Sequence, residues 1–155
     1  FVSKFVAIVN KWRVSHRNLT LELTEGALIR GVSVIQRRVR ELAEQGFNLS
    51  IDDFGLGDSN LNYLQDLPIT ELKVDRVFVE AMEGSQQKTL LVTSICNMAK
   101  ALHINTVAEG IETTGQLDQA KACGCGAFQG YYLDKPMSVD DWKSKISEKQ
   151  YKEGS

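Results

Sequence analysis

Strand-like and helix-like patterns alternate along this chain, and that alternation constrains its fold more than any other feature. Residues 19–25 and 47–52 alternate strictly between apolar and polar side chains, and shorter strand-like segments follow at 70–75, 104–110 and 126–130. Repeated strand and helix units of this kind predict a parallel sheet with right-handed crossovers. The predicted fold class is therefore α/β.

Amphipathic helical patterns lie around these strands. They cover residues 1–14, 31–45 and 61–67, a segment from Ser85 to Leu102, another from Thr113 or Thr114 to Ala120, and a last one from Ser138 through Ile146. The first pattern places Trp12 on the apolar stripe, and the fourth places Leu91 there. We expect His16 to be a solvated loop residue. Residues 1–148 are predicted to form the domain, followed by a polar tail at 149–155.

Each predicted strand ends in a polar or charged residue. These residues are Glu22, Asp52 with Asp53, Lys73, Glu109 and Gln129, at spacings of 30, 21, 36 and 20 residues. Ligands of parallel α/β sheets and barrels bind at the carboxyl ends of the strands. Random surface charges would not fall at every strand end, so the pattern favours a site.

Each of these residues also has an ordinary structural explanation. The two aspartates are typical of a solvated turn, and Glu22 would suit a solvated sheet face. Lys73 is flanked by apolar residues, as are many surface lysines whose stems lie along apolar surface. Adjacent aspartates repel each other unless a divalent cation holds them, however, and this makes the pair the centre of the predicted site.

Five units are too few for a closed barrel. A (β/α)₈ barrel has eight strands and typically about 250 residues, whereas this chain has 155 residues and opens on a helix. We therefore expect three further strands upstream. The alternative is an open doubly wound sheet, but no glycine-rich phosphate-binding loop follows the first strand.

Composition excludes several classes of protein. Apolar residues make up 43% and charged residues 25% of the chain, which is typical of a globular domain, and the formal net charge is only −2. No apolar run approaches the roughly 18 residues of a membrane span. We expect a cytoplasmic domain with no DNA partner and no membrane contact from this segment, although the parent protein could be tethered to the inner membrane.

The three cysteines, Cys96, Cys123 and Cys125, fit neither a C-x-x-C redox pair nor a zinc knuckle. We expect reduced thiols packed among small residues. Metal binding or redox chemistry is the alternative.

Five motifs, in order, resemble the signature of EAL domains, bacterial phosphodiesterases of the second messenger cyclic di-GMP. They are Leu21-Glu22-Leu23-Thr24-Glu25, Asp52-Asp53-Phe54-Gly55, Leu72-Lys73-Val74-Asp75-Arg76, Ala108-Glu109-Gly110-Ile111-Glu112 and Gln129-Gly130-Tyr131. The resemblance runs from about residue 1 to about residue 142. It implies a partial TIM-like (β/α) barrel, with about five parallel βα units of an eight-stranded EAL barrel.

The resemblance also implies a site with two ions of Mg²⁺ or Mn²⁺, which supports hydrolysis of cyclic di-GMP to linear pGpG. Glu22 and Asp52 would bind one ion, and Asp52, Asp53 and Glu109 would surround the other. The Glu-Ala-Leu motif and the asparagine ligand of the family do not occur at the expected places in this chain. We expect both to lie in the upstream strands.

Further roles follow from the same resemblance. Lys73 would orient the attacking water or stabilise charge at the phosphate, and Gln129 would assist the water near the second ion. Together with Glu109, these are the predicted catalytic residues. Glu25 and Glu112 would hold loops in place.

The loop after Asp53 departs from the family pattern, because Leu56 and Asp58 replace the usual residues. The alternative function is therefore a degenerate, non-catalytic EAL module that binds cyclic di-GMP or a protein partner. We expect the 155-residue chain alone to be inactive, since its first metal site lacks ligands. We also expect it to self-associate or to form a homodimer.

Overall fold

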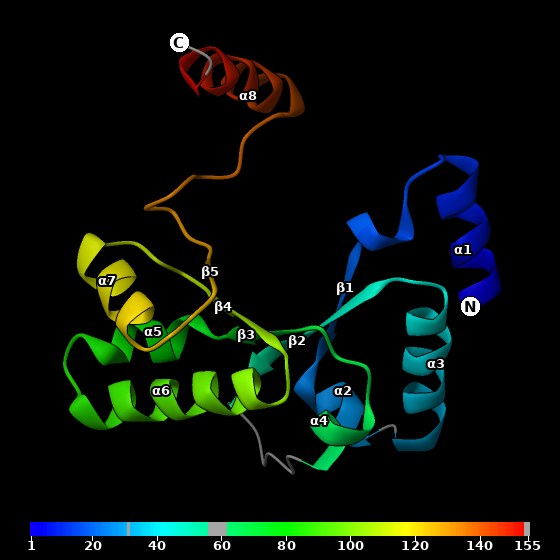
Figure 1. Ribbon diagram of the computed structural model, residues 1–155, viewed down its shortest axis with the longest axis horizontal. Coiled ribbons are helices and arrows are strands. Elements are labelled where there is room, and N and C mark those ends of the chain that lie inside the picture. The colour runs from blue at the N-terminus through cyan, green and yellow to red at the C-terminus, as the bar shows by residue number, and fades with distance from the viewer. Residues whose placement is uncertain (31, 56–61, 154–155) are drawn as a thin grey trace.

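The computed structural model describes residues 1–30, 32–55 and 62–153, and its strands form one parallel sheet (Figure 1). The strands are β1 (Thr20–Thr24), β2 (Asn48–Phe54), β3 (Glu71–Val74), β4 (Asn105–Ala108) and β5 (Ala127–Phe128). Their spatial order is β1-β2-β3-β4-β5. This sequential order is that of a barrel wall, whereas a doubly wound sheet reverses its order at a switch point. The predicted TIM-like arrangement of five parallel strands is confirmed.

The helices lie between and around these strands. They are α1 (Val2–Lys11), α2 (Glu25–Arg30), α3 (Val32–Glu44), α4 (Asn62–Asp66), α5 (Arg76–Met82), α6 (Gln86–Ala101), α7 (Thr114–Ala122) and α8 (Val139–Glu153), with a 3₁₀ turn, η1, at His16–Asn18. The structure confirms the cap at Ser85, whose side chain accepts a hydrogen bond from the backbone N–H of Lys88. It selects Thr113 over Thr114 as the cap of α7.

Two short helices, α2 and α5, were absent from the sequence prediction. Helix α2 begins directly after β1 and contains Gly26, a poor helix former, so its pattern is weak. Helix α5 has a recognisable start, because the Asp75 side chain accepts a hydrogen bond from the backbone N–H of Val77. Aspartate is a preferred residue at the N-cap of a helix, so this start could have been predicted from Asp75.

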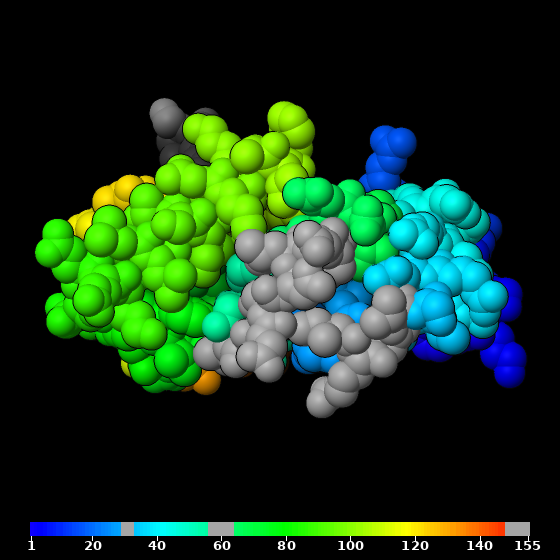
Figure 2. Space-filling view, turned by 90° about the horizontal axis from the view of Figure 1, so that it is seen from below, coloured from blue at the N-terminus to red at the C-terminus, as the bar shows by residue number. Residues whose placement is uncertain are grey.

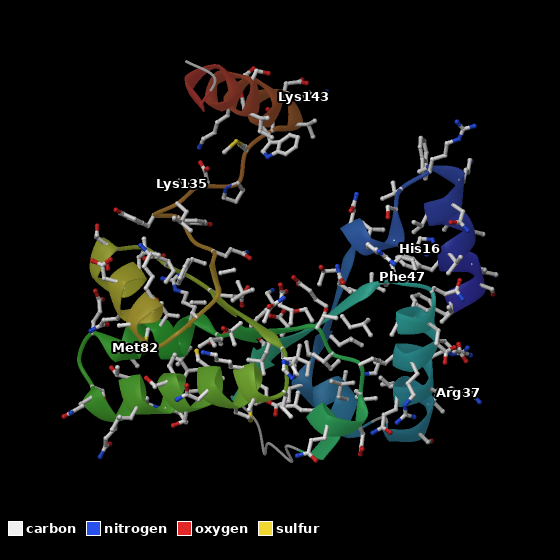
Figure 3. The ribbon with its side chains drawn as sticks, viewed as in Figure 1. His16, Arg37, Phe47, Met82, Lys135 and Lys143 are labelled. Carbon is white, nitrogen blue, oxygen red and sulfur yellow. The ribbon has the colours of Figure 1, made fainter. Side chains whose placement is uncertain are left out.

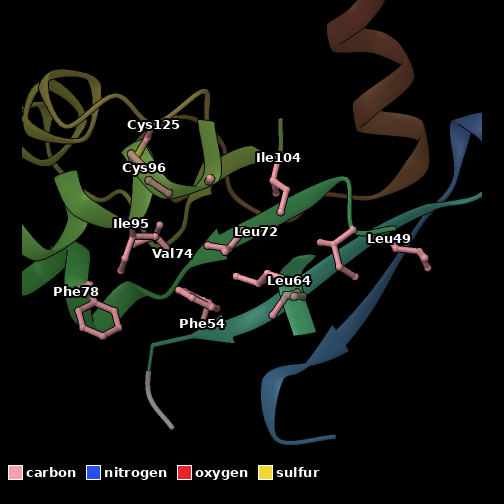
Figure 4. Close-up of a cluster of buried hydrophobic side chains, with 14 of the residues drawn as sticks. Leu49, Phe54, Leu64, Leu72, Val74, Phe78, Ile95, Cys96, Ile104 and Cys125 are labelled. Carbon is pink, nitrogen blue, oxygen red and sulfur yellow. The ribbon is translucent and has the colours of Figure 1, made fainter. Parts of the chain in front are cut away.

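The core lies between the central strands and their covering helices. Leu49, Leu72 and Val74 are fully buried in β2 and β3, and Phe78 of α5 and Ile95 of α6 complete one side of the cluster (Figure 4). Helices α3, α4 and α6 lie below the sheet in Figure 1. Seen from below, α3 (cyan) and α6 (green) cover separate areas of this outer face (Figure 2). Because the helices pack against the sides of the strands, the ends of the strands can carry polar groups.

The first helix is joined to the sheet by a histidine that is not a solvated loop residue, so that prediction was wrong. The ring of His16 is half-buried and stacks on Phe47 with a centroid distance of 4.4 Å (Figure 3). Its Nδ1 lies 2.6 Å from the backbone oxygen of Gln45, and its Nε2 lies 2.9 Å from Oδ1 of Asn10. Trp12 was also misplaced, because it is 72% exposed.

The last helix, α8, lies apart from the sheet in Figure 1. It continues to Glu153, through residues that the sequence assigned to a polar tail. Its Val139 and Trp142 side chains are exposed. Among the described helices, none is both long and apolar enough to cross a membrane.

Candidate active site

The ammonium of Lys73 forms ion pairs with carboxylates at or near the ends of three other strands. Its Nζ lies 3.0 Å from Glu22 Oε1, 3.2 Å from Asp52 Oδ1 and 2.8 Å from Glu109 Oε1. The Lys73 side chain is only 7% exposed, although that of Glu22 is 52% exposed. Lys73 is therefore not a surface lysine, and the strand ends predicted to converge do so.

Strand order explains this convergence. Glu22 lies on β1, Asp52 on β2 and Lys73 on β3, while Glu109 follows the last residue of β4. Parallel pairing holds the strands in register, with Thr24 opposite Asp52 and Lys73 opposite Val107. The backbone N–H of Glu109 continues the ladder with a hydrogen bond to the Val74 oxygen at 3.0 Å. Side chains from four consecutive strands can therefore meet at one end of the sheet.

Asp53 has an unusual backbone for a strand residue. Its φ is +57°, and the register between β2 and β3 shifts between Ile51 and Phe54. Consecutive strand residues normally point to opposite faces, and a left-handed residue interrupts that alternation. Its exposed side chain lies close enough to Asp52 and Lys73 to feel both charges. The irregularity thus adds a second carboxylate to the same region.

Charge and burial act on these groups in opposite directions. Burial alone would lower the pKa of Lys73, but hydrogen bonds to Glu109, Glu22 and Asp52 raise the pKa above its ordinary value. The pKa of Glu109 is raised by burial, which outweighs the opposing effect of Lys73. The pKa of the exposed Asp53 is raised by partial desolvation and then by the charges of Asp52 and Asp75. The site keeps one permanent cation among carboxylates that repel one another.

Gln129 and Glu109 line a pocket beside this cluster. The pocket has a volume of about 400 Å³, and its wall also includes Arg76, Glu112 and Tyr131. Gln129 follows β5 and is exposed, and its backbone N–H donates to the Ala108 oxygen at 2.8 Å. Glu109 therefore belongs both to the Lys73 cluster and to an open cavity.

The two residues predicted to hold loops make specific contacts. Glu25 is buried, and its Oε2 accepts a hydrogen bond from the backbone N–H of Gly55 at 3.1 Å. Glu112 forms an ion pair with Nη1 of Arg76 at 3.0 Å. Glu25 thus fixes the beginning of the loop that follows Asp53. Leu56 and Asp58, on which the alternative function depended, lie outside the described residues.

The donor set suits a hard divalent cation. Glu22, Asp52, Asp53 and Glu109 offer only carboxylate oxygens, which are the ligands that Mg²⁺ and Mn²⁺ prefer. Across residues 1–30, 32–55 and 62–153, no three histidine, cysteine, aspartate or glutamate side chains already surround a common metal position. Each carboxylate on Lys73 uses one oxygen for the ammonium. The carboxylates could therefore offer their other oxygens to a cation.

Comparison with known proteins agrees with this geometry. The family profile described as the EAL domain matches residues 1–136. The chain belongs to the EAL domain family. Cyclic di-GMP phosphodiesterase PA2567 of Pseudomonas aeruginosa is 35% identical to it over 145 residues, which cover 92% of this chain and 25% of that protein.

Solved EAL structures have the same fold. The EAL domain of Mycobacterium smegmatis DcpA matches with a TM-score of 0.87 at 28% identity, covering 95% of this chain and 66% of that one. Klebsiella pneumoniae BlrP1, in a complex with manganese and cyclic di-GMP, matches with a TM-score of 0.79 at 28% identity, covering 84% and 33%. This EAL chain spans 25% or less of the first curated relatives that it matches.

The sequence predicted most members of the site but missed two features of this EAL chain. One is the contact of Lys73 with three carboxylates. An alternating pattern of apolar and polar residues predicts which face of a strand a side chain lies on, but it does not predict which residues that side chain contacts. The other is Arg76, the first residue of α5, which pairs with both Glu80 and Glu112. Its position one residue after Asp75, at the start of α5, was the available signal.

Proposed function

We propose that this chain is part of a catalytic phosphodiesterase domain that hydrolyses cyclic di-GMP to linear pGpG. The observation that carries the proposal is the meeting of Glu22, Asp52 and Glu109 on the buried Lys73 ammonium. A chance surface cluster would not draw one group from each of four consecutive strand ends. Relatives named as cyclic di-GMP phosphodiesterases support the same substrate.

Glu22 and Asp52 would hold one divalent cation, Mg²⁺ or Mn²⁺, and Asp52, Asp53 and Glu109 would hold a second. When bound, such ions lower the pKa of a coordinated water and stabilise negative charge on the phosphate oxygens. The manganese complex of BlrP1, a protein of similar fold, supports the choice of a divalent ion. Asp52 is the residue shared by both positions.

Lys73 acts as a cation and not as a base. The hydrogen bonds that raise its pKa keep the ammonium protonated near neutral pH. Glu22, Asp52 and Glu109 fix the direction of its Nζ. A fixed positive charge stabilises the negative charge that develops on a phosphate oxygen as water adds and the P–O bond breaks.

Gln129 would orient the attacking water from the opposite wall. Its amide is both a donor and an acceptor, so it can bind water without removing a proton. It lines the same pocket as Glu109, Tyr131 and Lys135. That pocket is where we place part of the dinucleotide. Glu25 and Glu112 support the walls through Gly55 and Arg76.

The decisive experiment measures conversion of cyclic di-GMP to pGpG by the longer protein that carries this chain, with Mn²⁺ or Mg²⁺. We expect turnover that chelation stops and that Asp52→Asn reduces at least about a hundredfold, because the bridging carboxylate is lost. Asp118→Asn is the matched control, since Asp118 is exposed on α7 away from the strand ends.

A folded, metal-loaded wild-type protein that binds cyclic di-GMP without cleaving it would contradict the catalytic proposal. That result would favour the degenerate binding module instead. The identity of the residue at the upstream glutamate position separates the same two functions, because its replacement would remove a metal ligand.

The 155-residue chain alone has a different expected behaviour. Strands β1 and β5 are each paired on one side only among the described residues, and unpaired strand edges promote association. We expect the isolated chain to self-associate and to hydrolyse little cyclic di-GMP. Light scattering tests this, and a monodisperse monomer would contradict it. A cytoplasmic location likewise stays a prediction.

A further inference from the structure

Two cysteines from distant parts of the sequence meet beneath the sheet. Sγ of Cys96, on α6, lies 3.4 Å from Sγ of Cys125, which precedes β5 (Figure 4). Both side chains are buried, and both are free thiols. A disulfide requires a separation of about 2.05 Å, so the two sulfurs must approach by little more than 1 Å to bond.

The third cysteine has different neighbours. Sγ of Cys123 lies 3.7 Å from Sδ of Met82 and 3.7 Å from the backbone oxygen of Thr89. A thioether and a carbonyl oxygen offer no partner for disulfide exchange. Cys123 is therefore a natural control within the same turn.

Cys125 lies between two glycines. Gly124 adopts a φ of +91°, and a Cβ placed on it would lie 3.8 Å from Cβ of Cys96, which is ordinary contact. Gly126, on the other side of Cys125, has no side chain to obstruct a small backbone shift. The turn is held by its ends, where Cys125 N–H donates to the Ala120 oxygen and Gly126 N–H donates to the Thr106 oxygen.

Cys96, although buried, belongs to the wall of a pocket that opens to solvent. The pocket has a volume of about 450 Å³, and its wall also includes Lys100, His103 and Thr106. A hydrogen bond with Cys125 lowers the pKa of Cys96 to about 7, against the opposing effect of burial, and raises the pKa of Cys125. A thiolate is the nucleophilic form of cysteine, and nearby cationic groups favour it. Because Cys96 is the member of the pair that lines the pocket, it is the sulfur that a molecule in the pocket would meet.

We propose that Cys96 and Cys125 form a reversible intrachain disulfide when a small peroxide enters this pocket. In the first step the Cys96 thiolate attacks one peroxide oxygen, the O–O bond breaks and a sulfenic acid forms with release of hydroxide. In the second step the Cys125 sulfur attacks the Cys96 sulfur, the S–O bond breaks and water leaves. The sulfur pair loses two electrons, and the two peroxide oxygens gain them.

The disulfide would join α6 to the turn that starts β5. It closes a loop of 29 residues that contains β4 and α7. Because a crosslink restricts the unfolded chain, the oxidised form should resist unfolding more than the reduced form. This inference does not depend on the phosphodiesterase proposal, since it concerns the opposite end of the sheet.

The test is oxidation with hydrogen peroxide followed by alkylation and tryptic mapping. Trypsin does not cleave before Pro136, so digestion places Cys96 in peptide 89–100 and both other cysteines in peptide 122–143. We expect these two peptides to appear as one crosslinked species that has lost two hydrogen atoms. Dithiothreitol should restore both, and the melting temperature should rise on oxidation and fall again on reduction.

Variants assign the bond. Cys123→Ala should preserve the crosslink, whereas Cys96→Ala should abolish it and slow peroxide-dependent thiol loss at least about tenfold. Cys125→Ala should leave Cys96 as a sulfenic or more oxidised acid without a crosslink. The proposal is overturned if the wild-type chain keeps all of its thiols, if Cys123 is the crosslinked residue, or if the bonds join separate chains.

Discussion

The two ends of the same short strands have opposite chemistry. At the carboxyl end, carboxylates from β1, β2 and the residue after β4 surround the Lys73 ammonium. At the amino end of β4 and β5, Cys96 lines a pocket with Lys100, His103 and two glycines. Strand β4 has four residues, so roughly 13 Å separate the two environments. In a parallel sheet all carboxyl ends of the strands lie on one edge and all amino ends on the other. Mutations at one end should therefore have little effect on the other.

The largest expected effect is at the charged end. Lys73→Met leaves Glu22, Asp52 and Glu109 without their shared cation, so hydrolysis by the complete domain should fall at least about a hundredfold. The free energy of unfolding should fall by about 2 kcal/mol, because partly buried carboxylates lose their partner. Activity assays and urea unfolding measure the two effects. Lys121→Met, on the exposed surface of α7, should change neither.

The second effect concerns the backbone just beyond the carboxyl end of β5. A Cβ on Gly130 would lie 2.1 Å from the Ile111 oxygen and 2.2 Å from its nitrogen, so Gly130→Ala must displace main chain beside Gln129. We expect a loss of about 3 kcal/mol in unfolding free energy. Gly84→Ala is the matched control, because a Cβ there meets nothing within 4 Å. Equal stability of the two variants would refute this explanation.

A third, smaller effect should appear at Glu25. Glu25→Gln keeps an acceptor for the Gly55 N–H but removes the charge that strengthens the bond. We expect about 1 kcal/mol less stability and a drop in activity of the complete domain. Glu44→Gln, on the exposed face of α3, is the control. An activity loss with unchanged stability would assign Glu25 a role beyond holding the loop.

The smallest effect should come from the thiol end. Cys96→Ala removes one sulfur from a packed site, so a loss of about 1 kcal/mol is expected. Turnover of cyclic di-GMP under reducing conditions should not change, since the pair lies away from the Lys73 cluster. A marked fall in turnover would show that the two ends of the sheet are coupled.

Much of this arrangement was predictable from the chain itself. Alternation in residues 19–25 and 47–52 predicted two strands and the faces of Glu22 and Asp52, and parallel geometry then predicted that strand ends converge. An alternating sequence pattern does not predict contacts between residues far apart in the chain, however. The ion pairs of Lys73 with three carboxylates were therefore not predictable. The same limit applies to the Cys96 and Cys125 pair, which depends on how α6 packs against a turn 29 positions away.

Helix faces were predicted less accurately than strands. Leu91 was expected on the buried face of α6 but is 42% exposed, and the face is centred on Val92, Ile95, Cys96 and Ala99. Leu90 is exposed as well. With two adjacent leucines, the sequence pattern did not determine which face of the helix is buried. Which side of a helix is buried depends on the neighbours that it meets.

The left-handed backbone of Asp53 has a consequence for how this protein would respond to selection. A φ of +57° costs an ordinary side chain about 1 kcal/mol relative to glycine, and asparagine tolerates it better than most residues. Laboratory evolution for heat resistance alone would therefore favour glycine or asparagine at position 53. Such variants would discard a carboxylate that the proposed second cation needs. At position 53, the residue that is best for thermal stability differs from the residue that is best for catalysis. The aspartate found there is the one that suits catalysis.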